Sequence, residues 1–297
     1  GMQARAIVTN FWDMVLNPSS LERYSHVLIG ALLSGSFLVL SVSAWYILKK
    51  NYTAHAQAAF RIALWVAGIA ALGQLFTGHK SAEVVTKYQP AKLATMEGHF
   101  EKSAPADMYL FGWVNASEQK TTGLKIPGGL SFLVHQDFKA PIPGLNSFKP
   151  EDRPTAINFV FQTYHLMVAI GMTLIGLTWF GLFMLYRKKL FETRWLMQLF
   201  VWSVLLPQIA NQVGWYTAEV GRQPWVVYGL LRTSDALSQA VKAEHVLASL
   251  ILFTLVYVLL FGLFLYLLNK KIQHGLDVSN NGETSSRMNP SFLPMIE

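Results

Sequence analysis

The chain has 297 residues, of which 52% are hydrophobic and only 14% are charged, whereas soluble domains usually carry about 25% charged residues. This composition excludes an ordinary water-soluble domain and a disordered chain, and the absence of cysteine excludes a disulfide-rich scaffold and any cysteine-based metal site. A net charge of +7 would suit nucleic acid as a partner, but the cations stand at the ends of apolar runs. The sequence therefore predicts a membrane protein that does not bind nucleic acid.

Residues 1–25 precede the first apolar run. They lack a secretory signal, which would need a basic lead, an apolar core and a cleavage site. The topology derived below nevertheless places this lead-in outside the cytoplasm, and Gly1 stands before Met2. We therefore expect a portion of a longer protein whose earlier helices are missing.

Five apolar runs are long enough to cross about 30 Å of hydrocarbon. They are His26–Leu48, Ile62–Gly78, Asn158–Tyr186, Trp195–Tyr216 and His245–Leu268. The fourth contains Pro207 and three amide side chains (Gln208, Asn211 and Gln212), so we expect it to be kinked and to face protein rather than lipid. No alternating strand pattern competes. The expected fold class is an all-α integral membrane helical bundle, with five transmembrane helices and a long extracytoplasmic loop.

Basic residues between the runs predict the orientation, because short cytoplasmic loops are enriched in Lys and Arg. They fall in three places on the same side: Lys49, Lys50 and Arg61, then Arg187, Lys188, Lys189 and Arg194, then Lys270 and Lys271. The N-terminus, segment 79–156 and segment 217–244 are therefore expected outside, and the C-terminus in the cytoplasm.

The predicted organisation has five parts. They are the lead-in 1–25, a transmembrane helix pair over 26–78, the outer loop 79–156, three transmembrane helices over 157–268 and a disordered cytoplasmic tail over 269–297. The outer loop holds seven of the twelve prolines with nine Lys/Arg and eight Asp/Glu, and a loop of this length is more often functional than a plain connection. The tail includes the polar string SNNGETSSR.

His26 opens the first run at its outer end. It suits an ordinary interfacial histidine, but neutral imidazole is also a common metal ligand. A His and a Met together can hold a haem iron, and Met167 in the third run is an available partner, although a Met in a membrane usually serves packing. The residues alone leave both interpretations open.

The end of the fourth run carries a dense group of polar and aromatic residues. Glu219 and Arg222 are three apart, so they are neighbours on one helix face. Trp215 and Trp225 flank them, and Pro224 ends any helix before it. An ion pair beneath an aromatic belt would explain each residue singly. A cofactor with an iron and two propionates would also give the polar side chains of this helix their partners.

The outer loop contains the string QPAKLATME. Its Lys92 and Glu97 are five residues apart, about 140° around a helix, so they do not form a helical ion pair. They suit two solvated charges on a loop helix. They also suit a site where a cation and a carboxylate bind a quinol headgroup and accept its protons.

Together these strings resemble subunit I of cytochrome bd-type quinol oxidases. The matching strings are FWDMVLNPSSLERYSH ending at His26, QPAKLATME ending at Glu97, YHLM ending at Met167 and GWYTAEVGRQPW ending at Trp225. Their order and spacing match from Phe11 to about Leu268, which corresponds to the C-terminal portion of that subunit. The short outer loop is similar to the short-loop branch of the family.

The resemblance implies roles for the residues at these positions. His26 and Met167 would be the axial ligands of a low-spin haem b, and Lys92 and Glu97 would lie in the quinol-binding loop. Glu219 would be a ligand of a high-spin haem b.

The resemblance also places Arg222 and Trp215 close to the haems. Some members carry an Arg two residues before the Met ligand, where this chain has His165. His165 would either replace that contact or have no such role. His79, His99 and His245 match no ligand position.

The implied activity is that of a terminal respiratory oxidase in the bacterial cytoplasmic (inner) membrane. Ubiquinol or menaquinol would be oxidised at the outer face, and electrons would pass through low-spin haem b to high-spin haem b and haem d, where oxygen is reduced to water. The resemblance implies a second membrane subunit as partner and allows small accessory subunits. It leaves open which quinol is used and whether the third haem is d or b. Without the earlier helices, we expect the chain alone to be inactive.

Two other functions remain compatible with the residues. A quinol-binding b-type cytochrome without oxygen reduction would keep His26 and Met167 but would not need Glu219. A secondary transporter would use the polar fourth run as a substrate site near the bilayer midplane and would bind no haem.

Overall fold

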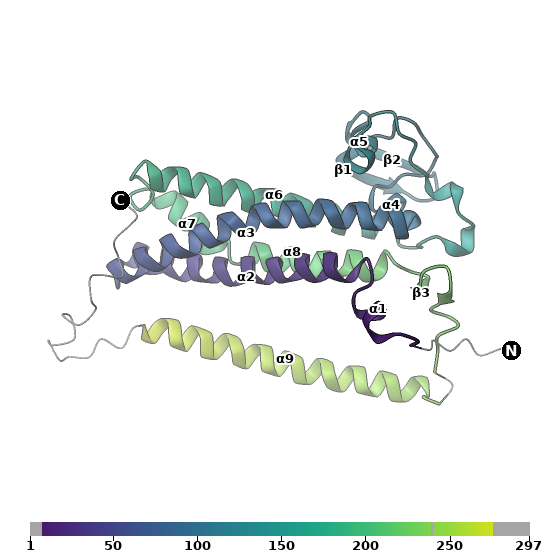
Figure 1. Cartoon of the computed structure of the whole chain (residues 1–297). Helices are drawn as coiled ribbons and strands as arrows, with labels where there is room; N and C mark the ends of the chain where they lie inside the picture. Colours follow the sequence, from purple (N-terminus) through teal and green to yellow (C-terminus); the bar gives the residue numbers. More distant parts are fainter. Residues whose placement is uncertain (1–7, 239, 276–297) are drawn as a thin grey trace. The chain divides into compact units, whose positions relative to one another are not determined.

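The computed structural model describes residues 8–238 and 240–275 and is dominated by long helices (Figure 1). It divides into two compact units, one ending at Leu237 and the other beginning at Ser238. The predicted fold class, a helical membrane bundle, is confirmed by this architecture. Of the predicted cytoplasmic tail, residues 276–297 lie outside the described residues.

The first unit begins with a short helix, α1 (Phe11–Val15), capped by the Asn10 side chain, which accepts a hydrogen bond from the Trp12 N–H at 3.0 Å. Two long helices follow, α2 (Ser20–Lys49) and α3 (Thr53–Tyr88). Both extend beyond the apolar runs that predicted them, because hydrophobicity marks the part of a helix in hydrocarbon and not its end. The outer loop predicted from residue 79 therefore starts as helix.

The fourth predicted run forms two helices, α7 (Arg194–Trp202) and α8 (Leu205–Val220). Pro207 has no N–H to donate to the Ser203 carbonyl four residues earlier, and its ring crowds that carbonyl. The Leu206 N–H bonds the Ser203 carbonyl instead, at 3.1 Å, and the chain bends there. The kink is thus real and lies just before the proline.

Four helices in the described part of the chain are long and apolar enough to cross a membrane. Three belong to the first unit, α2, α3 and α6 (Ile157–Tyr186), and the fourth is α9 (Ala243–His274). The predicted count of five continuous spans is therefore not confirmed, because the break between α7 and α8 divides one of them. Helix α9 also runs through Lys270 and Lys271, so the predicted tail begins as helix.

The core of the first unit lies between α2, α3, α6 and α7, which run alongside one another in Figure 1. Phe60 of α3 meets Phe200 of α7 edge to face, with ring centroids 4.9 Å apart. Small residues let the backbones approach: a Cβ at Gly181 of α6 would lie 2.9 Å from the Phe200 ring. This packing fixes the long helices that carry the candidate site at one end.

The outer loop folds into a small module at one end of these helices (Figure 1). Helix α4 (Pro90–Met96) comes first, and then β1 (Met108–Asn115) pairs antiparallel with β2 (Lys120–Ile126). Helix α5 (Gly129–His135) and two 3-10 turns, η1 (Leu145–Ser147) and η2 (Pro150–Asp152), complete the module. A shorter hairpin, β3 (Trp225–Val227) with β4 (Leu231–Arg232), follows α8. The sequence analysis predicted no strands, so both hairpins are corrections to it.

The long hairpin is fixed to α6 by side chains that bond its backbone. Asn158 accepts a hydrogen bond from the Val114 N–H at 3.0 Å, and Gln162 donates to the Gly112 carbonyl at 2.7 Å. His165 Nε2 lies 2.8 Å from the Tyr109 carbonyl. These three α6 residues are four and three apart, so they share one face of the helix.

The hairpin also holds the turn after α4. Gly98 has φ +61°, and a Cβ there would lie 2.7 Å from Thr121 Oγ1 and 2.8 Å from Val114 Cγ2. The Thr121 hydroxyl donates to the Gly98 carbonyl at 2.6 Å.

We expect Gly98→Ala to destabilise the outer module by about 1–3 kcal/mol, because the substitution adds a left-handed strain and a steric clash. Faster hydrogen exchange over residues 98–126 would show this. Gly176→Ala is the matched control, since a Cβ at Gly176 meets nothing within 4 Å. Equal exchange in the two variants would contradict the expectation.

Candidate functional site

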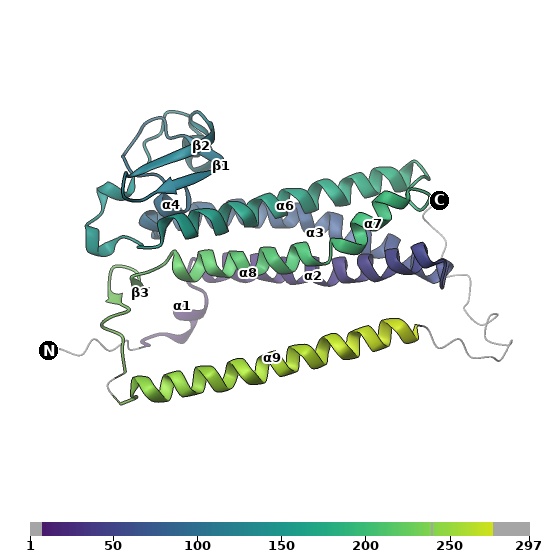
Figure 2. The ribbon, with the colours of Figure 1, turned by 180° about the vertical axis from the view of Figure 1, so that it is seen from behind.

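The residues predicted to act together lie toward the ends of α2, α3, α6 and α8 that are next to α4. Figure 2 shows α8 beside α2 and α6, and contacts between these helices confirm the view. His26 lies near the start of α2, Met167 lies in α6, and Glu219 is in the last turn of α8. Segments far apart in the sequence therefore meet at one end of the bundle.

His26 is held by two side chains of α3. Its Nδ1 lies 3.1 Å from Thr77 Oγ1, and the Thr77 hydroxyl itself donates to the Gly73 carbonyl. Thr77 can then accept from a His26 Nδ1–H, in the tautomer that leaves the lone pair on Nε2. The amide nitrogen of Gln74 lies 2.9 Å from Nε2 and 3.2 Å from Nδ1. A neutral imidazole fixed in this tautomer is the form that binds a metal through Nε2.

Met167 and the helix of His26 both contact one turn of α8. A Cβ at Gly214 would lie 2.7 Å from Met167 Sδ, so any larger residue there would displace the thioether. On the same turn, Asn211 Oδ1 would lie 2.9 Å from a Cβ at Gly30, one helical turn after His26. The turn Asn211–Gly214 therefore contacts α2 through Asn211 and α6 through Gly214.

The residues fit a haem-type group better than a bare metal ion. Within residues 8–238 and 240–275, no three His, Cys, Asp or Glu side chains gather as a metal site. A metal bound by His26 and Met167 would thus need a prosthetic group to supply its remaining ligands. The Gln74 side-chain oxygen is buried there without a hydrogen-bond partner, so the site retains unused bonding capacity beside the imidazole.

Glu97 ends α4 and is only 2% exposed. The Tyr164 hydroxyl of α6 hydrogen-bonds its carboxyl group, while the Oε2 atom is buried without a partner. Burial raises the pKa of Glu97 to about 7, and the Tyr164 hydrogen bond opposes that rise. Tyr164 lies three residues before Met167, so the same stretch of α6 binds the Glu97 carboxyl and carries the Met167 thioether.

Lys92 is also buried, with 7% exposure, and it does not pair with Glu97. Its ammonium donates to the Ala218 carbonyl of α8 at 3.1 Å. Burial lowers the pKa of Lys92 to about 8, and the positive charge of Arg23 adds to the effect. The interpretation of Lys92 and Glu97 as two solvated charges is therefore wrong.

Glu219 and Arg222 form an ion pair at the end of α8. Arg222 Nε and Nη2 lie 2.9 Å and 2.8 Å from the same carboxylate oxygen, Oε2. Trp215 is exposed, and its ring contacts that of Tyr216, with centroids 5.6 Å apart. Gln208, Gln212 and Trp215 lie on one face of α8 that the other helices of the first unit leave exposed. Asn211 donates to Ser34 Oγ of α2 at 2.9 Å and so faces protein, while for Gln208 and Gln212 this stays a prediction.

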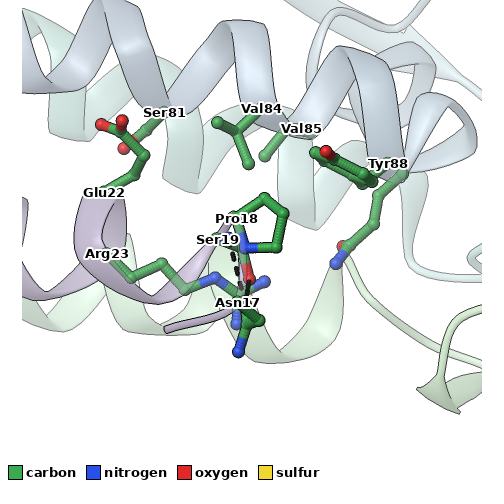
Figure 3. Close-up of a pocket in the computed structure, with 10 residues that line it drawn as sticks. Asn17, Pro18, Ser19, Glu22, Arg23, Ser81, Val84, Val85 and Tyr88 are labelled. Atoms are coloured by element: carbon green, nitrogen blue, oxygen red, sulfur yellow. Dashed lines mark hydrogen bonds between the residues drawn. The ribbon is translucent and has the colours of Figure 1, made fainter. Parts of the chain in front are cut away.

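A pocket of about 180 Å³ opens beside this group, between the start of α2 and the end of α3 (Figure 3). Val84 and Val85 form an apolar wall, and Figure 3 places Glu22 and Tyr88 at opposite ends. The polar lining includes Asn17, Glu22, Arg23, Ser81, Tyr88 and Gln89. The Gln89 side-chain oxygen is buried without a partner. Because Arg23 also acts on Lys92, the pocket lies next to the buried charges.

The remaining histidines have local roles. Both ring nitrogens of His165 lie 2.8 Å from main-chain carbonyls, those of Phe161 and Tyr109, so His165 joins α6 to the hairpin. His79 pairs with Glu83 at 3.2 Å, and His99 Nε2 lies 3.4 Å from Ser103 Oγ. His245 is exposed in the first turn of α9.

Sequence reasoning missed Thr77, Gln74 and Tyr164. Gln74 and Thr77 are three apart at the outer end of an otherwise apolar run, which is a signal of a shared polar face. Tyr164 could have been found by its position three residues before Met167.

Residues 1–276 match the family model described as cytochrome bd terminal oxidase subunit I. The chain is 31% identical over 296 residues to cytochrome bd ubiquinol oxidase subunit 1 of Bacillus subtilis, covering 96% of this chain and 63% of that protein. It is 34% identical over 266 residues to a putative cytochrome bd menaquinol oxidase subunit I of the same organism, covering 86% and 58%. Identity to the cytochrome bd-II ubiquinol oxidase subunit 1 of Escherichia coli is 26% over 337 residues, covering 91% and 65%.

The fold is similar to that of the bd oxidase from Geobacillus thermodenitrificans, with a TM-score of 0.81 and 30% identity over 90% of this chain and 61% of that one. The chain thus spans 58% to 65% of the length of the curated relatives it matches. None of these similarities favours a transporter.

We expect Tyr164→Phe to raise the pKa of Glu97 by about half to one unit, because the lost hydrogen bond stabilised the ionised carboxyl. The carboxylic C=O stretch in infrared difference spectra, followed against pH, measures this pKa. Glu97→Gln identifies the band by removing it. A Glu97 titration that is identical with Phe at position 164 would show that the hydrogen bond has no influence.

Proposed function

Because the chain belongs to the cytochrome bd terminal oxidase subunit I family, we propose that it forms the haem- and quinol-binding part of a terminal respiratory quinol oxidase. One observation supports this most strongly. The helices of His26 and Met167 contact the same turn of α8, and the buried carboxyl of Glu97 is hydrogen-bonded three residues from that methionine.

The family resemblance implies the roles of the cofactor residues, and their donor atoms suit these roles. His26 through Nε2 and Met167 through Sδ would hold a low-spin haem b, with Thr77 fixing the imidazole tautomer. Glu219 would ligate a high-spin haem b, with Arg222 holding one carboxylate oxygen. When bound, these haems and haem d supply one-electron and oxygen chemistry.

Trp215 and His165 complete the proposed haem surroundings. Trp215 offers an exposed ring on the same face of α8 as the amides. His165 orients the Met167 stretch of α6 through its contacts with two carbonyls.

Quinol oxidation would take place at the outer module. The pocket beside Arg23 and Gln89 offers an apolar wall for a ring and polar groups for its hydroxyls. Glu97, at the opposite end of α4 from Gln89, would accept a quinol proton, because a carboxyl with a pKa of about 7 is matched to that task near neutral pH. Ubiquinol and menaquinol both fit this chemistry.

We further propose a multi-pass location in the bacterial inner membrane, with residues 79–156 outside and the C-terminus in the cytoplasm. The cations at the inner ends of the helices support this orientation. A second membrane subunit is the proposed partner, with oxygen as the second substrate. The polar face of α8 that the other helices of the first unit leave exposed supports the need for further helices.

In the complete oxidase, we expect Met167→Leu to abolish the low-spin haem b band in the reduced-minus-oxidised visible spectrum, because leucine supplies no ligand atom. Met172→Leu, on the same helix but 53% exposed, should leave the band unchanged. If the band persists in both variants, Met167 is not a ligand of the low-spin haem b.

The rate of quinol oxidation should rise as pH increases through about 7, because Glu97 must be ionised to accept a proton. Glu97→Gln should remove this acid limb and slow turnover, measured as kcat/KM against pH. Glu118→Gln, an exposed carboxyl of the same loop, is the control and should keep the limb. An unchanged profile with Gln at position 97 would assign the limb to another group.

A further inference from the structure

The end of α8 leaves main-chain carbonyls that need partners. A helix has no internal donors for its last four carbonyls, and Pro224 prevents α8 from continuing. The Thr217 carbonyl accepts from the Gly221 N–H at 3.1 Å, and the Val220 carbonyl accepts from the Gln223 N–H at 3.2 Å. The Ala218 carbonyl receives its hydrogen bond from a side chain of the outer loop, the Lys92 ammonium at 3.1 Å.

Burial and packing of the Lys92 side chain both favour this contact. It is nearly fully buried, and its stem packs beside Gly221, where a Cβ would lie 3.4 Å from Lys92 Cε. A cation at a helix C-terminus also interacts favourably with the helix dipole. The ammonium is therefore directed at the end of α8, 126 residues away in the sequence.

The bonded carbonyl belongs to the residue immediately before Glu219. The Arg222 ion pair to Glu219 Oε2 stabilises the same turn. The charges of both residues act on the Lys92 ammonium. Fixing the Ala218 peptide consequently fixes the backbone from which the Glu219 carboxylate projects.

We propose that Lys92 is a positioning residue for Glu219, holding the last turn of α8 from the quinol loop. This rests on the proposed function, in which Glu219 is a haem ligand. It gives Lys92 a role toward the haem side of the site that is separate from any contact with quinol.

The test uses the complete oxidase and the variant Lys92→Met, which keeps the length of the side chain but has no donor. We measure the transfer of each haem to excess apomyoglobin from the visible spectrum, and the KM for quinol. The high-spin haem should leave roughly 10-fold faster, as is typical when a residue supporting a metal ligand is removed, while the low-spin haem leaves at the parent rate.

Lys92→Arg keeps a cationic donor and should restore high-spin haem retention. Lys102→Met, an exposed lysine of the same loop, should match the parent. If the Met variant does not assemble, Lys92→Gln decides: its shorter, uncharged donor should give a haem loss faster than the parent, and a parent-like rate would overturn the proposal.

Parent-like haem retention in Lys92→Met with a raised KM would also overturn it. That result would restrict Lys92 to quinol binding and leave the proposed function intact. If the parent oxidase contained no haem, the positioning role of Lys92 and the proposed function would both be rejected.

Discussion

The structure depends on one constraint: at membrane depth, each main-chain group released by a helix break needs another partner. The helix break between α7 and α8 illustrates this requirement. Where Pro207 interrupts the helix, the Ser203 carbonyl takes the Leu206 N–H, and the Ser41 hydroxyl of α2 donates to the Val201 carbonyl at 2.6 Å. Leaving such a group unpaired costs about 1–3 kcal/mol. Irregular helices are therefore possible only where neighbouring helices supply donors.

The same requirement assembles the candidate site from distant segments. His26 hydrogen-bonds Thr77 of α3, and Glu97 hydrogen-bonds Tyr164 of α6. Lys92 donates to the Ala218 carbonyl of α8. Each of the three side chains bonds a different helix, so the outer loop and the membrane helices constrain one another. A side chain in this group cannot be changed without releasing its partner, and that explains why the site is both polar and buried.

Hydrophobicity predicted the long helices but not their ends, because α2 and α3 continue into polar surroundings where transfer energy gives no signal. It also missed the β1–β2 hairpin. That hairpin is stabilised by Asn158 and Gln162 of α6 bonding its backbone and not by an alternating apolar face. The candidate strings could be found individually in the sequence. Their mutual contacts could not, because nothing in the string around Lys92 indicates that its ammonium bonds the end of α8.

The opposite pKa shifts of Glu97 and Lys92 follow from the same burial. Desolvation disfavours the charged form of each, and since they bond different helices, neither charge offsets the other. Near neutral pH the buried acid is poised between its two forms while the buried base is still mostly charged. Within the proposed function, proton acceptance then belongs to Glu97, which is free to titrate. Lys92 gives one N–H to the Ala218 carbonyl and keeps two further N–H donors, so its proposed place in the quinol site stands beside Arg23, Tyr88 and Gln89 of the adjoining pocket.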